Sequence, residues 1–161
     1  MLIVVCGLQG TGKTTVAREI QESTDGVLLR TDTIRQELFK NPEYTDEEMQ
    51  KVYDEMLSRA EEHLRKDENV VLDATFSDRE NREKAVNVAK KTNSKYRIMK
   101  VECPVEVVRK RIEDRTDDES DADFEVYLEY RDAFDELQIE HVTIDNSQEL
   151  EKTQKQLDNY F

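Results

Sequence analysis

The chain has 161 residues, of which 38 are acidic and 24 are basic, and its formal net charge is −14 at pH 7. This length suits a single compact domain, residues 1–161, in which about two-thirds of the surface of the unfolded chain becomes buried. The acidic excess disfavours extensive nonspecific binding to nucleic acid, because such binding depends on basic surface. No apolar run approaches the roughly 20 residues that span a bilayer, and no basic lead-in marks a signal peptide. We therefore expect a cytoplasmic protein without a membrane partner.

The two cysteines, Cys6 and Cys103, each lie at the end of an expected strand. This placement favours reduced, buried thiols over a disulfide framework. Neither cysteine has the spacing of a zinc-ligand pair, and the two histidines, His63 and His141, stand alone. A zinc site is therefore not expected.

Short apolar segments typical of buried strands alternate along the chain with segments of helical periodicity. This alternation predicts βαβ units and hence an α/β domain of three layers, a parallel sheet between two layers of helices. Residues 45–48 and 77–80 each have the spacing of a capping box, which marks the start of a helix. The expected strands are residues 2–6, 27–30, 70–73, 97–103 and 141–145, and the expected helices begin at or near Lys13, Thr33, Thr45, Ser77, Pro104, Ala122 and Ser147.

A glycine-rich segment, Gly-Leu-Gln-Gly-Thr-Gly-Lys-Thr at residues 7–14, joins the first strand to the first helix. Its spacing is that of a P-loop, in which backbone N–H groups and the helix N-terminus hold the phosphates of a nucleotide. Lys13 is expected to reach the β- and γ-phosphates and the Thr14 hydroxyl to ligate Mg²⁺. The segment predicts a nucleotide-binding protein with ATP and Mg²⁺ as cofactors. The predicted phosphate-binding residues are Gly7, Gly10, Thr11, Gly12, Lys13, Thr14 and Thr15.

Asp32 and Arg35 follow the second expected strand. Ligands of an open α/β sheet bind beyond the carboxyl ends of the strands, so both residues are expected to face the P-loop crevice, one helical turn apart. A kinase needs a carboxylate to accept the proton of the acceptor hydroxyl, and Asp32 suits that role. Arg35 suits an anionic group on the acceptor or the transferring phosphoryl group. The alternative interpretation is a surface ion pair near a helix start.

Asp73 ends the third expected strand, as the carboxylate of a Walker B motif does. There it is expected to hold Mg²⁺ through water or to position the acceptor hydroxyl. A simple turn-capping aspartate is the alternative. Thr75, Arg79 and Arg82 follow in the same crevice-facing segment and are candidates for contact with the acceptor.

An arginine-rich helix leads into the acidic segment 116–121, and together they are expected to form a lid over approximately residues 109–125. Arg111 and Arg115 are four residues apart and therefore share one helix face. Arginines on a closing lid neutralise charge that develops on the γ-phosphoryl group and exclude water. Both are predicted to be catalytic, with Arg115 favoured over Arg111, and the alternative is a solvated helix end.

These motifs together resemble the AAA_33-type P-loop kinases, which are related to the kinase domain of polynucleotide kinase, zeta toxin, chloramphenicol phosphotransferase and gluconate kinase. The resemblance rests on the P-loop, the Asp-x-x-Arg at 32–35, the strand-Asp-Ala-Thr at 70–75, the Cys-Pro at 103–104 and the arginine helix. It implies the P-loop nucleoside triphosphate hydrolase fold, with a five-stranded parallel sheet of order 2-3-1-4-5 and a small helical lid. It also implies that Asp32 is the general base, that Arg35 binds the acceptor, and that Arg111 or Arg115 acts from the lid.

The predicted function is an ATP-dependent, Mg²⁺-requiring kinase that phosphorylates a hydroxyl of a small molecule. Polynucleotide kinases that resemble the chain present basic surface to nucleic acid, whereas this chain is strongly acidic. A polynucleotide 5′-hydroxyl or tRNA-linked kinase is therefore the alternative, and a non-catalytic nucleotide-dependent switch is the third hypothesis. The motifs specify neither the acceptor, nor the oligomeric state, nor a preference for ATP over GTP.

Overall fold

The structure, a computed structural model, describes residues 1–115 and 120–161, and the side chains of all of these except residues 120–122. Strands and helices alternate along the chain, as the sequence predicts. The strands are β1 (Leu2–Cys6), β2 (Val27–Arg30), β3 (Val70–Asp73), β4 (Tyr96–Glu102) and β5 (Val142–Asp145). The helices are α1 (Lys13–Thr24), α2 (Thr31–Leu38), α3 (Asp46–Leu64), α4 (Arg79–Lys91), α5 (Val105–Arg115), α6 (Ser120–Ala133) and α7 (Leu150–Leu157).

The five strands form one parallel sheet in the order β2-β3-β1-β4-β5, which confirms the predicted topology. In the register of the sheet, Asp73 at the end of β3 is paired with Val5 of β1 and with Arg30 of β2. Because strands in register place paired side chains on the same face, Arg30 and Asp73 lie side by side at the carboxyl edge of the sheet.

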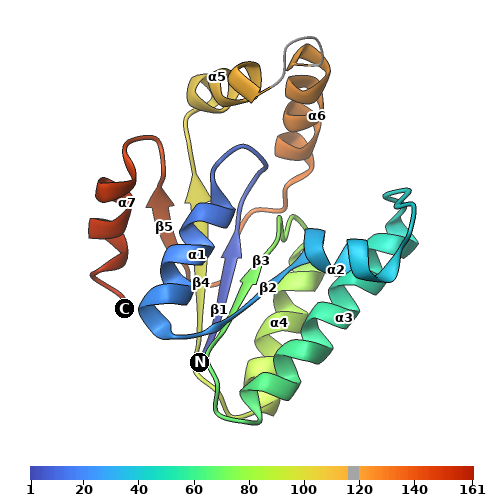
Figure 1. Ribbon diagram of the computed structural model, residues 1–161, viewed down its shortest axis with the longest axis vertical. Coiled ribbons are helices and arrows are strands. Elements are labelled where there is room, and N and C mark those ends of the chain that lie inside the picture. The colour runs from blue at the N-terminus through green and yellow to red at the C-terminus, as the bar shows by residue number, and fades with distance from the viewer. Residues whose placement is uncertain (116–119) are drawn as a thin grey trace.

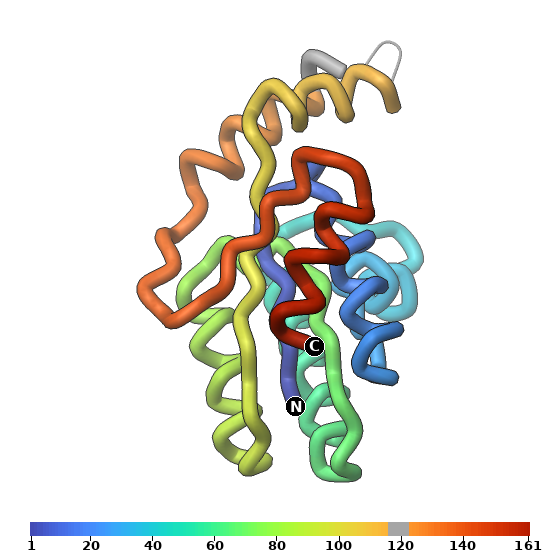
Figure 2. The backbone as a smooth tube through the Cα atoms, turned by 90° about the vertical axis from the view of Figure 1, so that its left-hand side faces the viewer, coloured from blue at the N-terminus to red at the C-terminus, as the bar shows by residue number. Residues whose placement is uncertain are grey.

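Helices cover both faces of the sheet, so the three-layer prediction is also confirmed (Figure 1). One face packs against α1 and α7 through a core that includes Val5, Ile20 and Leu157. The opposite face packs against α3 and α4. Helices α5 and α6 lie beyond the carboxyl ends of the strands, and the N- and C-termini of the chain lie away from these two helices in both views (Figures 1 and 2).

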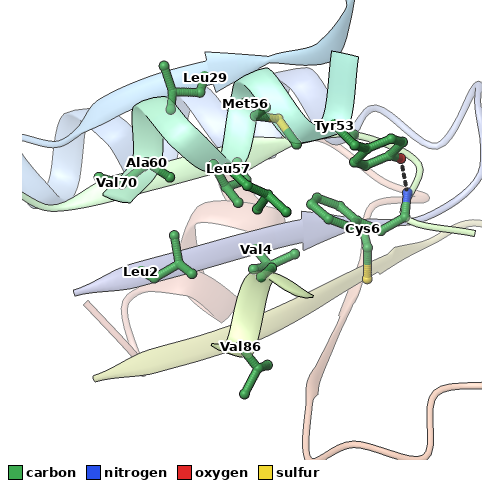
Figure 3. Close-up of a cluster of buried hydrophobic side chains, with 14 of the residues drawn as sticks. Leu2, Val4, Cys6, Leu29, Tyr53, Met56, Leu57, Ala60, Val70 and Val86 are labelled. Atoms are coloured by element: carbon green, nitrogen blue, oxygen red, sulfur yellow. Dashed lines mark hydrogen bonds between the residues drawn. The ribbon is translucent and has the colours of Figure 1, made fainter. Parts of the chain in front are cut away.

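The core between the sheet and α3 is built from alternate residues of β1, namely Leu2, Val4 and Cys6, which are fully buried (Figure 3). In this core the Tyr53 hydroxyl accepts a hydrogen bond from the backbone N–H of Phe76 at 3.0 Å (Figure 3). Burial raises the pKa of the Cys6 thiol to about 12, because the charged thiolate is poorly solvated there.

Several element boundaries differ from those expected. Helix α4 begins at Arg79 with Asp78 as its N-cap, so the capping box expected at Ser77 is wrong. The Ser77 carbonyl instead accepts a hydrogen bond from the backbone of Asp135, which holds this turn against the segment after α6. Helix α2 begins two residues before Thr33, directly after β2, and α7 begins three residues after Ser147.

Two further expectations can be compared with the structure. Cys6 and Cys103 are both free thiols, as predicted, but only Cys6 is buried, whereas Cys103 is half-buried. Within the part of the chain that the structure describes, no helix is long and apolar enough to cross a membrane.

Candidate active site

The P-loop turns between β1 and α1 through three glycines with positive φ, namely Gly7 at +143°, Gly10 at +78° and Gly12 at +81°. These angles strain any residue with a Cβ. Space is also short, because a Cβ on Gly10 would lie 2.8 Å from Cγ1 of Val108 in α5, and a Cβ on Gly7 would collide with the carbonyl of Val101 in β4. The glycines are therefore needed to bring the loop close to β4 and α5.

Two side chains of the P-loop close the turn on itself. The Thr11 hydroxyl and the Lys13 ammonium donate to the carbonyl oxygen of Leu8, at 2.7 and 3.0 Å. Burial lowers the pKa of Lys13, and the nearby carboxylates of Asp73 and Asp32 oppose this shift. An ammonium with few solvent contacts is well suited to bind the phosphates of a nucleotide. Thr15, the last predicted phosphate-binding residue, is exposed on the first turn of α1.

Asn146, at the end of β5, anchors the P-loop from outside. Its side-chain N–H donates to the carbonyl of Thr11 at 2.8 Å, and its side-chain oxygen accepts from the buried Thr153 hydroxyl at 2.7 Å. A Cβ on Gly12 would collide with this amide. The sequence analysis did not single out Asn146, and the structure commits its amide to the loop. Helix α7 begins later than the sequence predicts because residues 146 and 147 form the turn that positions the Asn146 amide.

Thr14 and Asp73, the predicted metal ligands, are in direct contact. The Thr14 hydroxyl donates to Oδ2 of Asp73 at 2.8 Å, and Asp73 is only 5% exposed. A hydroxyl and a carboxylate are hard oxygen ligands, which Mg²⁺ prefers, and Mg²⁺ usually completes its shell with water and phosphate oxygens. Among the described residues, no cluster of three or more acidic, histidine or cysteine side chains offers a self-contained metal cage. The pair therefore fits a Mg²⁺ ion that is shared with a nucleotide.

Arg30, which the sequence did not single out, joins this pair to Asp32. Its Nε donates to Oδ2 of Asp73 at 3.1 Å, one terminal nitrogen donates to the Thr14 hydroxyl at 3.3 Å, and the same nitrogen lies 3.9 Å from Asp32. Only the register of β2 on β3 identifies Arg30 as a member of the site, because this register places Arg30 beside Asp73.

Asp32 is exposed over 73% of its side chain and lies on the first turn of α2. Arg35, one turn later, is buried and forms an ion pair with Asp32 at 3.4 Å. The structure therefore brings these two predicted residues together beside the metal-ligand pair. An exposed carboxylate with its position fixed by a buried arginine can accept a proton from a bound hydroxyl.

The buried carboxylate of Glu48 forms an ion pair with Arg35. Glu48 lies 3.6 Å from Nε of Arg35 and accepts the backbone N–H groups of Glu43 and Tyr44 at 2.9 and 3.3 Å. The guanidinium of Arg35 also stacks on the Tyr44 ring, 4.8 Å from its centre. Glu48 thus ties the loop before α3 to Arg35. Sequence analysis recognised residue 48 only as the end of a capping box.

The three candidates after β3 do not share one environment. Thr75 lies at the base of the P-loop, where its carbonyl accepts the N–H of Gly7 at 3.2 Å. Arg79 is exposed and pairs with Glu83 at 2.7 Å. Arg82 is buried, and its terminal nitrogens donate to the carbonyls of Phe76, Ser77, Asp135 and Glu136. Arg82 therefore fixes the segment after α6 to the turn after β3, and its guanidinium is committed to the protein itself.

Both predicted lid arginines lie beside the P-loop. Arg111 donates to the carbonyls of Gly10 at 3.4 Å and of Asn146 at 2.6 Å. Arg115, one turn later, is exposed at the end of α5, and its Nε donates to the carbonyl of Arg111 at 3.3 Å. Residues 116–119, the tip of the expected lid, lie outside the described residues. Of the two, Arg111 is engaged with the loop, and Arg115 is the one that remains accessible.

A cavity of 660 Å³ adjoins the P-loop on the side of β4. It is lined by Gly7 and Leu8 of the P-loop and by Tyr127 and Arg131 of α6. Its polar lining carries both signs of charge, from Lys100, Arg131, Glu102, Glu136 and Asp145. A cavity of this volume accommodates a metabolite-sized molecule.

The sheet order, the glycine turn into α1 and the acid at the end of β3 define the P-loop NTPase fold. The chain belongs to the AAA_33 family, an AAA domain family whose model matches residues 2–137. This membership confirms the resemblance found in the sequence and implies that the chain binds a nucleotide.

Relatives and solved structures agree with this assignment. Uncharacterized proteins of Mycobacterium tuberculosis and Mycobacterium bovis are 30% identical over 137 residues, which cover 78% of this chain but 28% of theirs. A gluconokinase from Sinorhizobium meliloti superposes with a TM-score of 0.69 at 21% identity, over 95% of this chain and 86% of its own. The Mycobacterium tuberculosis APS kinase CysC, solved with AMPPNP and APS, superposes with a TM-score of 0.72 at 14% identity, over 98% of this chain and 95% of its own.

Proposed function

We propose that the chain is an ATP-dependent, Mg²⁺-requiring kinase that transfers the γ-phosphoryl group to a hydroxyl of a small-molecule acceptor. The observation that carries the proposal is the continuous set of contacts from the P-loop to Asp32. Thr14 contacts Asp73, Arg30 contacts both, and Arg30 reaches Asp32. A nucleotide cradle alone fits many functions, whereas a carboxylate held beside the cradle fits phosphoryl transfer to a hydroxyl.

Each residue then has a role in the reaction. The P-loop N–H groups and Lys13 bind the β- and γ-phosphates, and Arg115 approaches the transferring group from α5. Mg²⁺, held by Thr14 and Asp73, would neutralise charge on the phosphates. Asp32 accepts the proton of the acceptor hydroxyl as its oxygen bonds to the γ-phosphorus. The bond from that phosphorus to the bridging oxygen breaks, and ADP leaves.

The acceptor proposed is a small molecule, because the chain carries a charge of −14, which disfavours an extended polyanion as acceptor. The gluconokinase and the APS kinase, which share the fold, act on small molecules according to their names. Arg82, a residue expected to help bind an acceptor, is turned into the protein. These points favour a metabolite over a polynucleotide.

The test is ADP release measured over a panel of hydroxyl metabolites, with 5′-hydroxyl oligonucleotides included for the alternative. Asp32→Asn keeps the size and the contact with Arg35 but cannot take a proton, so turnover should fall by about 10²-fold or more while ATP affinity stays near normal. Lys13→Ala should lower both turnover and nucleotide affinity. Wild-type turnover in Asp32→Asn would remove Asp32 from the role of base, and turnover with oligonucleotides alone would replace the small acceptor.

A further inference from the structure

Asp73 Oδ2 is shared by two donors of different kinds. The Thr14 hydroxyl reaches it at 2.8 Å and Nε of Arg30 at 3.1 Å. Asp73 is buried at the carboxyl end of β3, so its charge needs a partner, and an uncompensated buried carboxylate is strongly unfavourable. Arg30 provides that partner from the neighbouring strand.

The backbone fixes Arg30 in this position. Arg30 ends β2 and is the residue paired with Asp73 in the register of the sheet. It is also the N-cap of α2, so its main chain is held by both a strand and a helix. The side chain of Arg30 is 26% exposed, so it is not enclosed by the protein.

A Mg²⁺ ion held by Thr14 and Asp73 cannot lie next to Arg30 as the structure places it. The ion requires the same carboxylate and hydroxyl that receive the hydrogen bonds of Arg30, and a dication repels a guanidinium at this separation. Asp32 offers Arg30 a second partner, since its carboxylate is already 3.9 Å from the terminal nitrogen.

We infer that Arg30 is a positioning residue that keeps Asp73 and Thr14 in place, opposes binding of free Mg²⁺, and moves toward Asp32 when Mg²⁺ arrives with nucleotide. The phosphates supply the negative charge that makes displacement of Arg30 favourable, so the metal enters as a complex with the nucleotide. On Asp32, the displaced guanidinium orients the carboxylate. The inference rests on the proposed function for the metal site alone, and it requires no particular acceptor.

Binding of Mg²⁺ without nucleotide tests the inference, measured by calorimetric titration. Arg30→Gln removes the competing charge, so the dissociation constant for Mg²⁺ should fall by about tenfold or more relative to wild type. Arg65→Gln is the matched control, because Arg65 contacts Glu61 near the end of α3 and its loss changes the net charge equally. The double variant Arg30→Gln/Asp73→Asn should lose the increase in Mg²⁺ affinity that Arg30→Gln alone produces, which would place the metal at Asp73. Equal affinities in Arg30→Gln and Arg65→Gln would overturn the inference.

A second measurement uses the wild-type protein and does not depend on how Arg30→Gln folds. The Nε–H resonance of Arg30, assigned by its absence in Arg30→Lys, should shift when Mg²⁺ and a non-hydrolysable ATP analogue are added together. The analogue with EDTA should leave it in place. A resonance unchanged by the Mg²⁺ complex would refute the displacement. If Arg30 behaves as inferred but no acceptor is phosphorylated, the kinase proposal fails and this inference stands.

Discussion

Replacing Asn146 by alanine tests whether the P-loop is held from β5. The substitution removes the donor to the Thr11 carbonyl and the acceptor of the Thr153 hydroxyl, and both bonds are buried. A typical hydrogen bond contributes about 1 kcal/mol, and a buried partner left unsatisfied costs about 1–3 kcal/mol more. Thr153 is fully buried, whereas the Thr11 carbonyl keeps a weak contact with the Cys103 thiol. We expect Asn146→Ala to lower the free energy of unfolding by about 2–4 kcal/mol.

The same substitution should also weaken nucleotide binding. The amide of Asn146 lies against Gly12, so its removal lets the turn relax away from the geometry that gathers its N–H groups. Urea unfolding followed by circular dichroism gives the stability, and titration with a fluorescent ATP analogue gives the affinity. Asn159→Ala is the control, because that asparagine is exposed at the end of α7 and should change stability by less than about 0.5 kcal/mol. If Asn146→Ala matches Asn159→Ala in stability, or binds nucleotide as wild type does, the anchoring role is refuted.

Three further predictions concern the loop, the core and the acceptor side. Gly10→Ala should weaken nucleotide binding and destabilise by about 1–3 kcal/mol in urea, because φ is +78° and Val108 leaves no room; an unaffected variant would contradict the close approach. As the pH rises above 9, Cys6→Ala should lose less stability than the wild type. The pKa of the wild-type thiol is about 12 in the folded state and about 9 in the unfolded state, so only the unfolded state ionises between these values. The wild-type protein therefore loses, above pH 9, stability that it has below pH 9. The difference should reach about 3 kcal/mol at pH 11, and parallel pH profiles would contradict it. Glu48→Gln should destabilise the protein by about 3 kcal/mol and raise KM for the acceptor, because Arg35 loses the buried carboxylate that pairs with it. An unchanged KM would show that Glu48 has no influence on the acceptor site.

Local signals in the sequence predicted the turn of the P-loop and brought Thr14 and Asp73 to the same edge of the sheet. The glycine spacing at 7–12 predicts the turn because positive φ is a property of single residues, and Thr14 contacts Asp73 because each lies at a fixed place relative to a strand end. The sheet order followed from the resemblance to a family, since strand periodicity does not specify which strands are neighbours. Helix starts were less accurate. The Ser77 carbonyl bonds with Asp135, a partner that only the folded chain supplies, and the N–H of Ser147 bonds with the side chain of the nearby Asp145.

The residues that sequence reasoning missed act over long separations in the chain. Arg30 depends on the register of two strands, and Asn146 meets Thr11 across 135 positions. Arg82 is a different case, in which the sequence pattern did not reveal the direction of the side chain. It follows a strand end, as a ligand-binding residue would, but four backbone carbonyls satisfy its guanidinium and turn it inward. The direction of a side chain in a helix turn depends on residues from other segments that pack against it, and the local sequence does not identify those residues.

The net charge of −14 and a site for anionic phosphates are compatible because electrostatic interactions at physiological salt are short-ranged. Exposed charges separated by more than about 8 Å are largely screened, so a nucleotide responds mainly to the groups that line the crevice. Those groups include Lys13, Arg111 and Arg115, while Asp32 and Asp73 are paired with Arg35 and Arg30. A small anion can therefore bind in this crevice although the chain as a whole is acidic. An extended polyanion would leave the crevice and meet the acidic surface, which is the physical reason that the proposed acceptor is a small molecule.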